Sequence, residues 1–209
     1  MRRLRPARCR CRMTASTATE AVPACVDLLW LPLGAGGHVV RWNGRAFEAV
    51  SALLQRRPAA DLYHSALAVR LDGRRHVIEQ APAWGMGSRE RGVVSGGAVG
   101  ARRLGRWRLF RYEVRCWADG VISDAAEAVD SPVRVPSDTV RARRLLDLVA
   151  HVPTATWGRD ELGTGEMWNS NSIIAWLLAS SGHDVGAITA PRGGRAPGWS
   201  AGLIAASRR

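Results

Sequence analysis

Residues 173–178 (IIAWLL) are apolar nearly all round a helical turn, which is the pattern of a helix that other elements enclose on all sides. Gly182 follows where such a helix is expected to end. A polar run, residues 168–172 (WNSNS), stands just before it. A buried helix that begins near Ser170 therefore predicts a globular domain assembled around it.

The first half of the chain is rich in strand signals. Residues 62–71 alternate between apolar and polar, Asp72-Gly73 is a hairpin turn signal, and residues 76–79 return. The apolar run 26–31 ends at Pro32 and a Gly-rich break, which predicts a buried strand and a turn. Two further strands are expected, at 38–42 and 107–117.

Two more helices are expected from the spacing of apolar residues. One covers residues 45–54 and is stopped by Pro58. The other starts from the cap residues 137–139 (SDT) and runs to Pro153. Residues 85–106 are rich in Gly, Ser and Arg and are expected to form a long loop, and residues 191–199 an irregular one. The sequence thus predicts an α+β fold, with a small antiparallel sheet packed against helices.

The net charge of +12 is carried unevenly. Six of the arginines lie in residues 1–12, and the chain contains no Lys. We expect residues 1–20 to be a disordered basic leader outside the packed core, with Met13 as an alternative start. Residues 21–209 are long enough for one well-filled core and are expected to form a single domain.

Residues 102–112 mix arginines with aromatic side chains and allow two interpretations. In a nucleic-acid-binding protein, such residues would contact phosphates and stack on bases. The alternation also fits a strand with one solvated face, and we prefer that interpretation. Nucleic-acid binding is accordingly disfavoured, although the arginines keep it as a third hypothesis.

No metal, cofactor or membrane span is expected from the sequence. The histidines and cysteines lack the close spacing of metal ligands, and Cys25 and Cys116 are isolated, as is typical of small buried apolar residues. No stretch of about 18 consecutive apolar residues occurs. A cytoplasmic location is expected by default.

The polar start of the buried helix is the best candidate for chemistry. The first N–H groups of a helix are unpaired, and its dipole places partial positive charge there, so an anion can be stabilised. Ser170 could act as a nucleophile at this point if a base is close. His64 on the predicted strand 62–71 is the best candidate base, and Glu79 on the returning strand could orient its ring.

This order of elements resembles a known superfamily. A strand His, a polar residue on the next strand, and an Asn-Cys-Asn type motif opening a helix are similar to the circularly permuted papain-like (NlpC-like) proteins, including the lecithin:retinol acyltransferase and PPPDE groups. The resemblance covers roughly residues 60–80 and 137–182. It implies a papain-like fold, with His64 as base, Glu79 as orienting group and Ser170 in the position of the nucleophile.

The chain departs from that pattern because Ser170 stands where the family has Cys. A thiol beside His readily becomes a thiolate, whereas a Ser hydroxyl must lose its proton during attack. Ser170 also has a purely structural interpretation as the helix N-cap, a role that Asn169 or Asn171 could equally take. Residues expected to bind substrate or an oxyanion are Asn169, Asn171, Tyr63, Trp168 and Arg159.

Two functions are therefore expected to compete. The first is a hydrolase or acyltransferase that acts on an amide or ester through Ser170, His64 and Glu79. The second is a catalytically inactive papain-like domain that keeps the pocket and binds a peptide or lipid. The substrate or ligand is not specified by either pattern.

Overall fold

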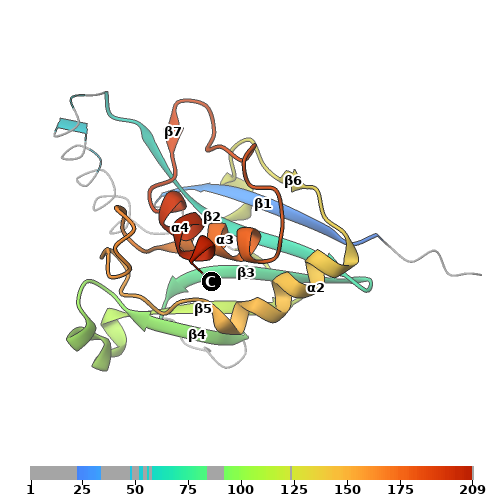
Figure 1. Ribbon diagram of the computed structural model, residues 1–209, viewed down its shortest axis with the longest axis horizontal. Helices are drawn as coiled ribbons and strands as arrows, with labels where there is room; N and C mark the ends of the chain where they lie inside the picture. Colours follow the sequence, from blue (N-terminus) through green and yellow to red (C-terminus); the bar gives the residue numbers. More distant parts are fainter. Residues whose placement is uncertain are drawn as a thin grey trace, which may run out of the picture.

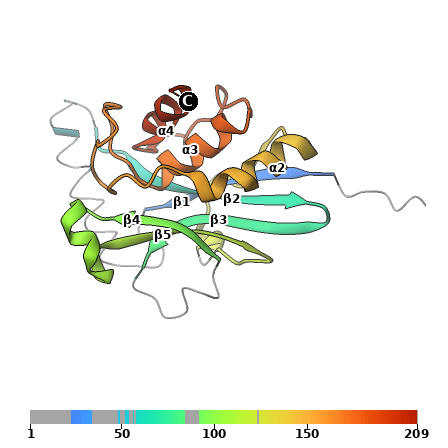
Figure 2. The same ribbon diagram turned by 60° about the horizontal axis from the view of Figure 1, so that its bottom comes forward.

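The computed structural model describes residues 23–33, 58–83, 92–122 and 124–208, together with Glu48, Ala52, Leu53 and Arg56. Its fold is α+β, as expected: an open, largely antiparallel sheet carries the helices on one face (Figures 1 and 2). The expected leader and the strand at 38–42 lie outside the described residues, and so does most of the helix at 45–54.

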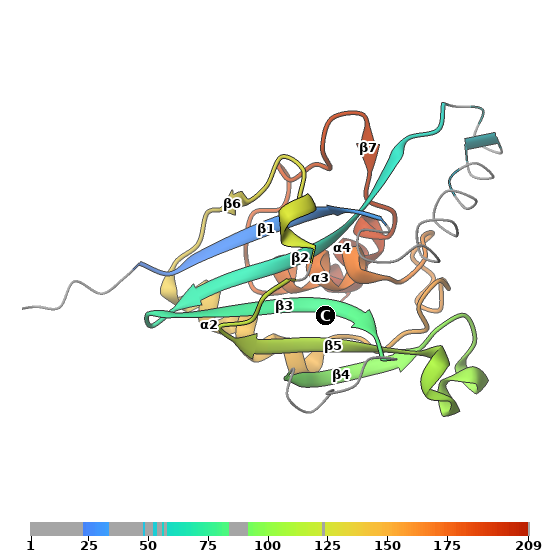
Figure 3. The same ribbon diagram turned by 180° about the vertical axis from the view of Figure 1, so that it is seen from behind.

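The sheet follows the order β4-β5-β3-β2-β1-β6, and the short strand β7 pairs in parallel with the start of β2. Its strands are β1 (Cys25–Pro32), β2 (Asp61–Leu71), β3 (Arg74–Pro82), β4 (Val93–Ala98), β5 (Arg111–Ala118), β6 (Val133–Val135) and β7 (Gly194–Arg195). Figure 3 shows the sheet from the side that the helices leave open.

The hairpin of β2 and β3 confirms the strongest local prediction. The strands pair from Leu67 opposite Ile78 to Leu71 opposite Arg74. Both turn residues have left-handed backbones, with φ of 50° at Asp72 and 76° at Gly73. Asp and Gly tolerate this conformation better than other residues, which explains why the turn could be recognised from the sequence.

Three helices pack on the sheet: α2 (Thr139–Leu148), α3 (Ser170–Ser180) and α4 (Trp199–Ser207). Asp138 caps α2 by accepting a hydrogen bond from the Arg141 N–H, which confirms the cap region predicted there. Helix α3 is buried along most of its length, as its apolar sequence predicts. Helix α4 approaches it closely, since a Cβ on Gly202 would lie 2.2 Å from the Ser172 carbonyl oxygen.

The core divides into two clusters on the two faces of the sheet. The larger cluster joins the helices to side chains such as Leu28, Leu67 and Ile78. The smaller one covers the opposite face and contains Leu29, Leu31, Ala66, Ala68, Val77 and Ile122. Successive residues of a strand point to opposite faces, so membership of a cluster identifies the face that each position occupies.

Two loop and strand predictions were wrong. The loop expected at 85–106 contains strand β4, and the strand expected at 107–117 begins only at Arg111. Before Arg111 the chain forms two short 3-10 helices, η1 (Arg102–Arg106) and η2 (Arg108–Phe110). Alternating Arg and apolar residues had suggested a strand, but this segment lies beyond the end of the β4–β5 pairing and has no strand partner.

The irregular loop expected at 191–199 includes β7 and leads directly into α4. Cys25 and Cys116 are free and half-buried rather than fully buried. Among the helices that the structure describes, none has the length and apolar character required to cross a bilayer.

Candidate functional site

The start of α3 is closed by its own polar residues. The Asn169 side-chain oxygen accepts hydrogen bonds from the N–H groups of Asn171 and Ser172, at 2.9 and 3.3 Å. The Ser172 hydroxyl in turn accepts from the Asn169 N–H at 3.1 Å, which completes a capping box. Asn169 is therefore the cap, and the interpretation of Ser170 as the N-cap was wrong.

Asn171 connects this helix end to the sheet. Its amide nitrogen donates to the carbonyl oxygens of Tyr63 and Pro197, each at 2.9 Å. Its amide oxygen accepts from the Ser65 hydroxyl at 2.9 Å. An Asn side chain has only two N–H donors, and both are used here. Asn171 is thus a structural bridge and, in this arrangement, has no hydrogen left to offer an oxyanion.

Ser170 lies at the first position of α3, with its side chain buried to 6% exposure. The other three residues of 169–172 all use their side chains in the hydrogen bonds just given. The hydroxyl of Ser170 has no hydrogen-bond partner among the described residues. Ser170, the residue expected to be the nucleophile, is therefore the one residue of 169–172 whose side chain takes no part in these hydrogen bonds.

His64 lies on β2, opposite Leu31 of β1. The side chains of its neighbours Tyr63 and Ser65 lie on the face of the sheet that carries the helices. Tyr63 belongs to the larger core cluster, and Ser65 donates a hydrogen bond to Asn171. By strand alternation His64 shares the other face with Ala66. Its imidazole forms no hydrogen bond with Ser170, and burial lowers its pKa to about 4. A base with so low a pKa has little affinity for the proton of a serine hydroxyl.

Glu79, expected to orient His64, is held by a cation instead. Its carboxylate lies 3.3 Å from the guanidinium of Arg115, which also contacts Glu113 at 3.0 Å. Arg115 is buried, with 5% of its side chain exposed. Glu79 and His64 belong to the same face of the sheet by alternation, but they are not hydrogen-bonded to each other.

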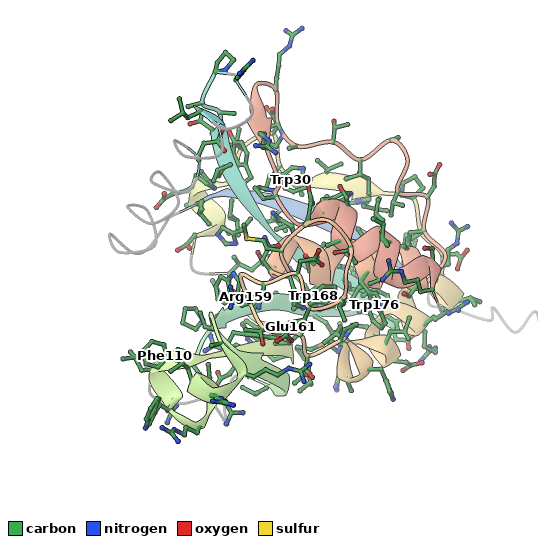
Figure 4. All side chains as sticks on the ribbon, turned by 60° about the vertical axis from the view of Figure 1, so that its left-hand side comes forward. Trp30, Phe110, Arg159, Glu161, Trp168 and Trp176 are labelled. Carbon is green, nitrogen blue, oxygen red and sulfur yellow. The ribbon has the colours of Figure 1, made fainter. Side chains whose placement is uncertain are left out.

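The other predicted binding residues are distributed around the start of α3. Tyr63 is buried, and its ring packs where a side chain on Gly194 would otherwise lie. Trp168 is a core residue at 1% exposure. The side chain of Arg159 is exposed, and its carbonyl accepts from the Trp168 N–H in the loop before α3 (Figure 4). Only Tyr63 among these touches the Asn171 bridge.

A pocket adjoins this helix end and was not anticipated. It has a volume of about 300 Å³ and is lined by Trp30 of β1, Trp199 of α4, Glu166, and residues 188–190 and 194–197. Pro197 links it to the site, because its carbonyl oxygen accepts hydrogen bonds from both Asn169 and Asn171. The sequence holds only an indirect signal for this pocket. The composition of residues 191–199 is typical of an ordered loop, but nothing in the sequence relates this loop to Trp30.

The polar groups of the pocket are few and specific. The Trp30 indole N–H is buried and has no acceptor among the described residues. The ring of Trp30 lies 5.2 Å from that of Trp199, tilted by 50°. Arg195 brings a guanidinium, which is ion-paired with Glu48 at 3.5 Å, and Glu166 accepts the Gly198 N–H at 2.9 Å. The pocket therefore offers aromatic side chains and a guanidinium that is ion-paired with Glu48, and one of its lining residues, Trp30, has a buried donor without an acceptor.

Comparison with known proteins does not assign a family. No family model matches the chain, and neither do any of the curated proteins or solved structures compared with it. Within the described ranges, no group of three or more His, Cys, Asp or Glu side chains is arranged to hold a metal ion.

Proposed function

We propose that this chain is a non-catalytic papain-like domain that binds a peptide or lipid ligand in the pocket beside the start of α3. The proposal rests on the indole N–H of Trp30. This N–H is buried and lacks an acceptor, and Trp30 lines that pocket. A buried donor without an acceptor is costly, and a ligand carbonyl or carboxylate would relieve that cost. Arg195, which is ion-paired with Glu48, lines the same pocket and adds guanidinium N–H donors for the same ligand group.

The ligand chemistry follows from the lining. Trp30, Trp199 and Ile188 provide apolar walls, so the ligand has a small apolar body. Trp30 and Arg195 favour an acceptor or anionic end, as found on the carboxyl terminus of a peptide or on a short fatty acid. We expect the domain to act in the cytoplasm.

The proposal is tested by titrating ligands into the ¹⁵N-labelled full chain and following the indole N–H resonances. Trp30→Phe assigns the Trp30 signal. We expect an N-acetyl dipeptide with an apolar C-terminal residue, or a short fatty acid, to move that signal saturably and downfield. Arg195→Ala should weaken binding about tenfold, the loss expected for one charge-assisted contact.

Arg192→Ala is the matched control, because Arg192 is exposed in the same segment but does not line the pocket. Binding in that variant should equal the wild-type value. A Trp30 resonance that neither ligand class moves at millimolar concentration would contradict the proposal.

A hydrolase is the second candidate, and one observation favours it: the Ser170 hydroxyl is not used by the capping box or by the bridge to β2. A fluorophosphonate probe distinguishes the two functions. Labelling that is lost in Ser170→Ala supports the hydrolase, whereas an unlabelled wild-type chain supports the binding domain.

A further inference from the structure

Exposed apolar side chains are concentrated at one end of the sheet. The described residues include eight exposed large apolar side chains, and five of them lie in this region. Two are on β4, and three are in the segment 102–110, which contains η1, η2 and Trp107 between them. Trp107 is 48% exposed and Leu109 is 59% exposed. This segment projects beyond the sheet on the side away from α2 and α4 (Figure 1), and Phe110 lies at its outer end (Figure 4).

Arginines surround these apolar groups. We define the η1–η2 patch as Val93, Val94, Trp107, Leu109 and Phe110 with Arg102, Arg103, Arg106, Arg108 and Arg111. Two carboxylates that contact arginines of this region are ion-paired, Glu161 with Arg102 and Glu113 with Arg115. The patch as a whole is therefore strongly positive.

A hollow in the patch brings three of the arginines together. Arg106, Arg108 and Arg111 line it, and Val93 and Val94 lie on its β4 side. Glu113 also lines it but is ion-paired with Arg115, and the Arg108 Nε–H donates to the Ala83 carbonyl at 2.7 Å. Its volume is about 540 Å³, which is ample for a phosphate group. Guanidinium groups bind phosphate through charge-assisted hydrogen bonds, so the hollow suits an anionic headgroup.

The apolar residues indicate which phosphate-bearing surface is the partner. Nucleic acid is held by aromatic rings whose faces are open for stacking. Here one face of Trp107 is covered by the Arg106 guanidinium, 4.0 Å from the ring centroid, and Phe110 packs edge-on at 6.4 Å. Leu109, Val93 and Val94 have no counterpart in nucleic-acid binding but are well suited to the acyl boundary of a bilayer.

We infer that the η1–η2 patch docks on an anionic lipid bilayer. The apolar side chains, led by Trp107 and Leu109, enter the headgroup–acyl boundary, and the arginines contact lipid phosphates. This surface is separate from the pocket at Trp30, because the hollow in the patch and that pocket share no lining residue, and Trp30 lies in the upper part of Figure 4 while Phe110 lies at its lower left. The inference therefore does not depend on the proposed function.

The test is sedimentation of the full chain with phosphatidylcholine vesicles that contain about 30% phosphatidylserine. We expect Trp107→Ser with Leu109→Ser to lower the partition coefficient about tenfold or more, because two inserted apolar side chains are lost. Arg103→Ser with Arg111→Ser should also weaken binding, and added salt should then matter less than for the wild type. Pure phosphatidylcholine vesicles should bind the wild type much more weakly.

Matched controls distinguish vesicle binding by this patch from non-specific apolar adsorption and from binding by the arginines of residues 1–12, which every variant retains. Val121→Ser with Val140→Ser removes side chains that are 77% and 76% exposed but lie outside the patch, and Arg144→Ser removes an exposed arginine of α2. These controls should bind as the wild type does. Patch variants that bind vesicles like the wild type would overturn the inference. The inference would also be overturned if the arginine variants lost binding to an oligonucleotide while the Trp107→Ser, Leu109→Ser variant bound vesicles as the wild type does.

Discussion

The amide of Asn171 joins three parts of the molecule: α3, β2 and the segment before α4. Its contacts are buried and far apart in sequence, so they fix where the helix begins relative to the sheet. Asn169 and Asn171, two residues of the predicted active centre, thus position the backbone. The same polar run that suggested chemistry is used to hold the helix end.

Asn171→Ala should lower the free energy of unfolding by about 2–4 kcal/mol, because the Ser65 hydroxyl and the Tyr63 carbonyl are left buried without their partner. Ser65→Ala removes only one hydrogen bond and should cost about 1 kcal/mol. Urea unfolding at pH 7 measures both. Equal losses in the two variants would contradict the bridging role of Asn171.

The pKa of His64 predicts an acid-sensitive fold. Burial lowers its pKa from 6.5 to about 4, so below pH 6.5 the unfolded chain takes up the proton more readily than the folded one. Stability from neutral His64 is complete above pH 6.5 and is lost as the pH falls toward 4. At pH 5 the loss is at most about 2 kcal/mol.

His64→Gln should therefore flatten the dependence of unfolding free energy on pH between 7 and 5. Some slope should remain, since burial also lowers the pKa of His183. An equally steep slope in His64→Gln would show that His64 is not the titrating group.

Helix α3 depends on the element that follows it. Gly198 has a φ of 84°, and a Cβ there would lie 2.6 Å from the Asn169 side-chain oxygen that caps the helix. The backbone before α4 thus passes directly over the α3 cap. Neither helix end can change without disturbing the other.

Gly198→Ala should destabilise the fold by about 3 kcal/mol or more, since backbone strain and a displaced cap add together. Gly163→Ala is the matched control, because Gly163 also has a positive φ, 60°, but has no atom within 4 Å of the added Cβ. It should cost about 1 kcal/mol. Thermal or urea unfolding of the pair measures the difference, and similar losses would mean that the cap tolerates the methyl group.

Elements with local signals could be predicted from the sequence. The β2–β3 hairpin has alternation and an Asp-Gly turn, and α3 has a continuous apolar run with polar residues before it. The 3-10 helices before β5 could not, because alternating Arg and apolar residues look alike in a strand and in exposed turns. Only the end of the pairing with β4 decides between them.

The candidate site was predicted in position but not in contacts. Spacing located the polar start of α3, and the structure confirms that a buried helix begins at Ser170. The hydrogen-bond partners of Asn171 and the ion-pair partner of Glu79 depend on which distant segments pack together. The residue types alone do not predict this packing. The pocket requires Trp30 and Trp199 to meet, and these are separated by most of the chain.

Across the whole molecule, the helices cover one face of the sheet (Figure 2), and the two proposed binding surfaces lie apart from each other. The pocket at Trp30 lies among β1, α4 and the segment before it, whereas the η1–η2 patch lies on the start of β4 and on the 3-10 helices that precede β5. Variants of one surface should leave the other unaffected. A ligand in the pocket and a bilayer at the patch can therefore be tested independently.

We propose that the start of α3 holds no working nucleophile–base pair, and the thiol pKa of Ser170→Cys is the measurement that decides this. Iodoacetamide alkylation across pH, followed peptide by peptide by mass spectrometry, separates this thiol from Cys116, whose pKa burial raises to about 11. We predict that His64→Gln leaves the titration midpoint of the thiol at position 170 unchanged, because any effect of the helix end on its pKa does not involve His64. A midpoint below about 7 that rises when His64 is replaced would contradict the account.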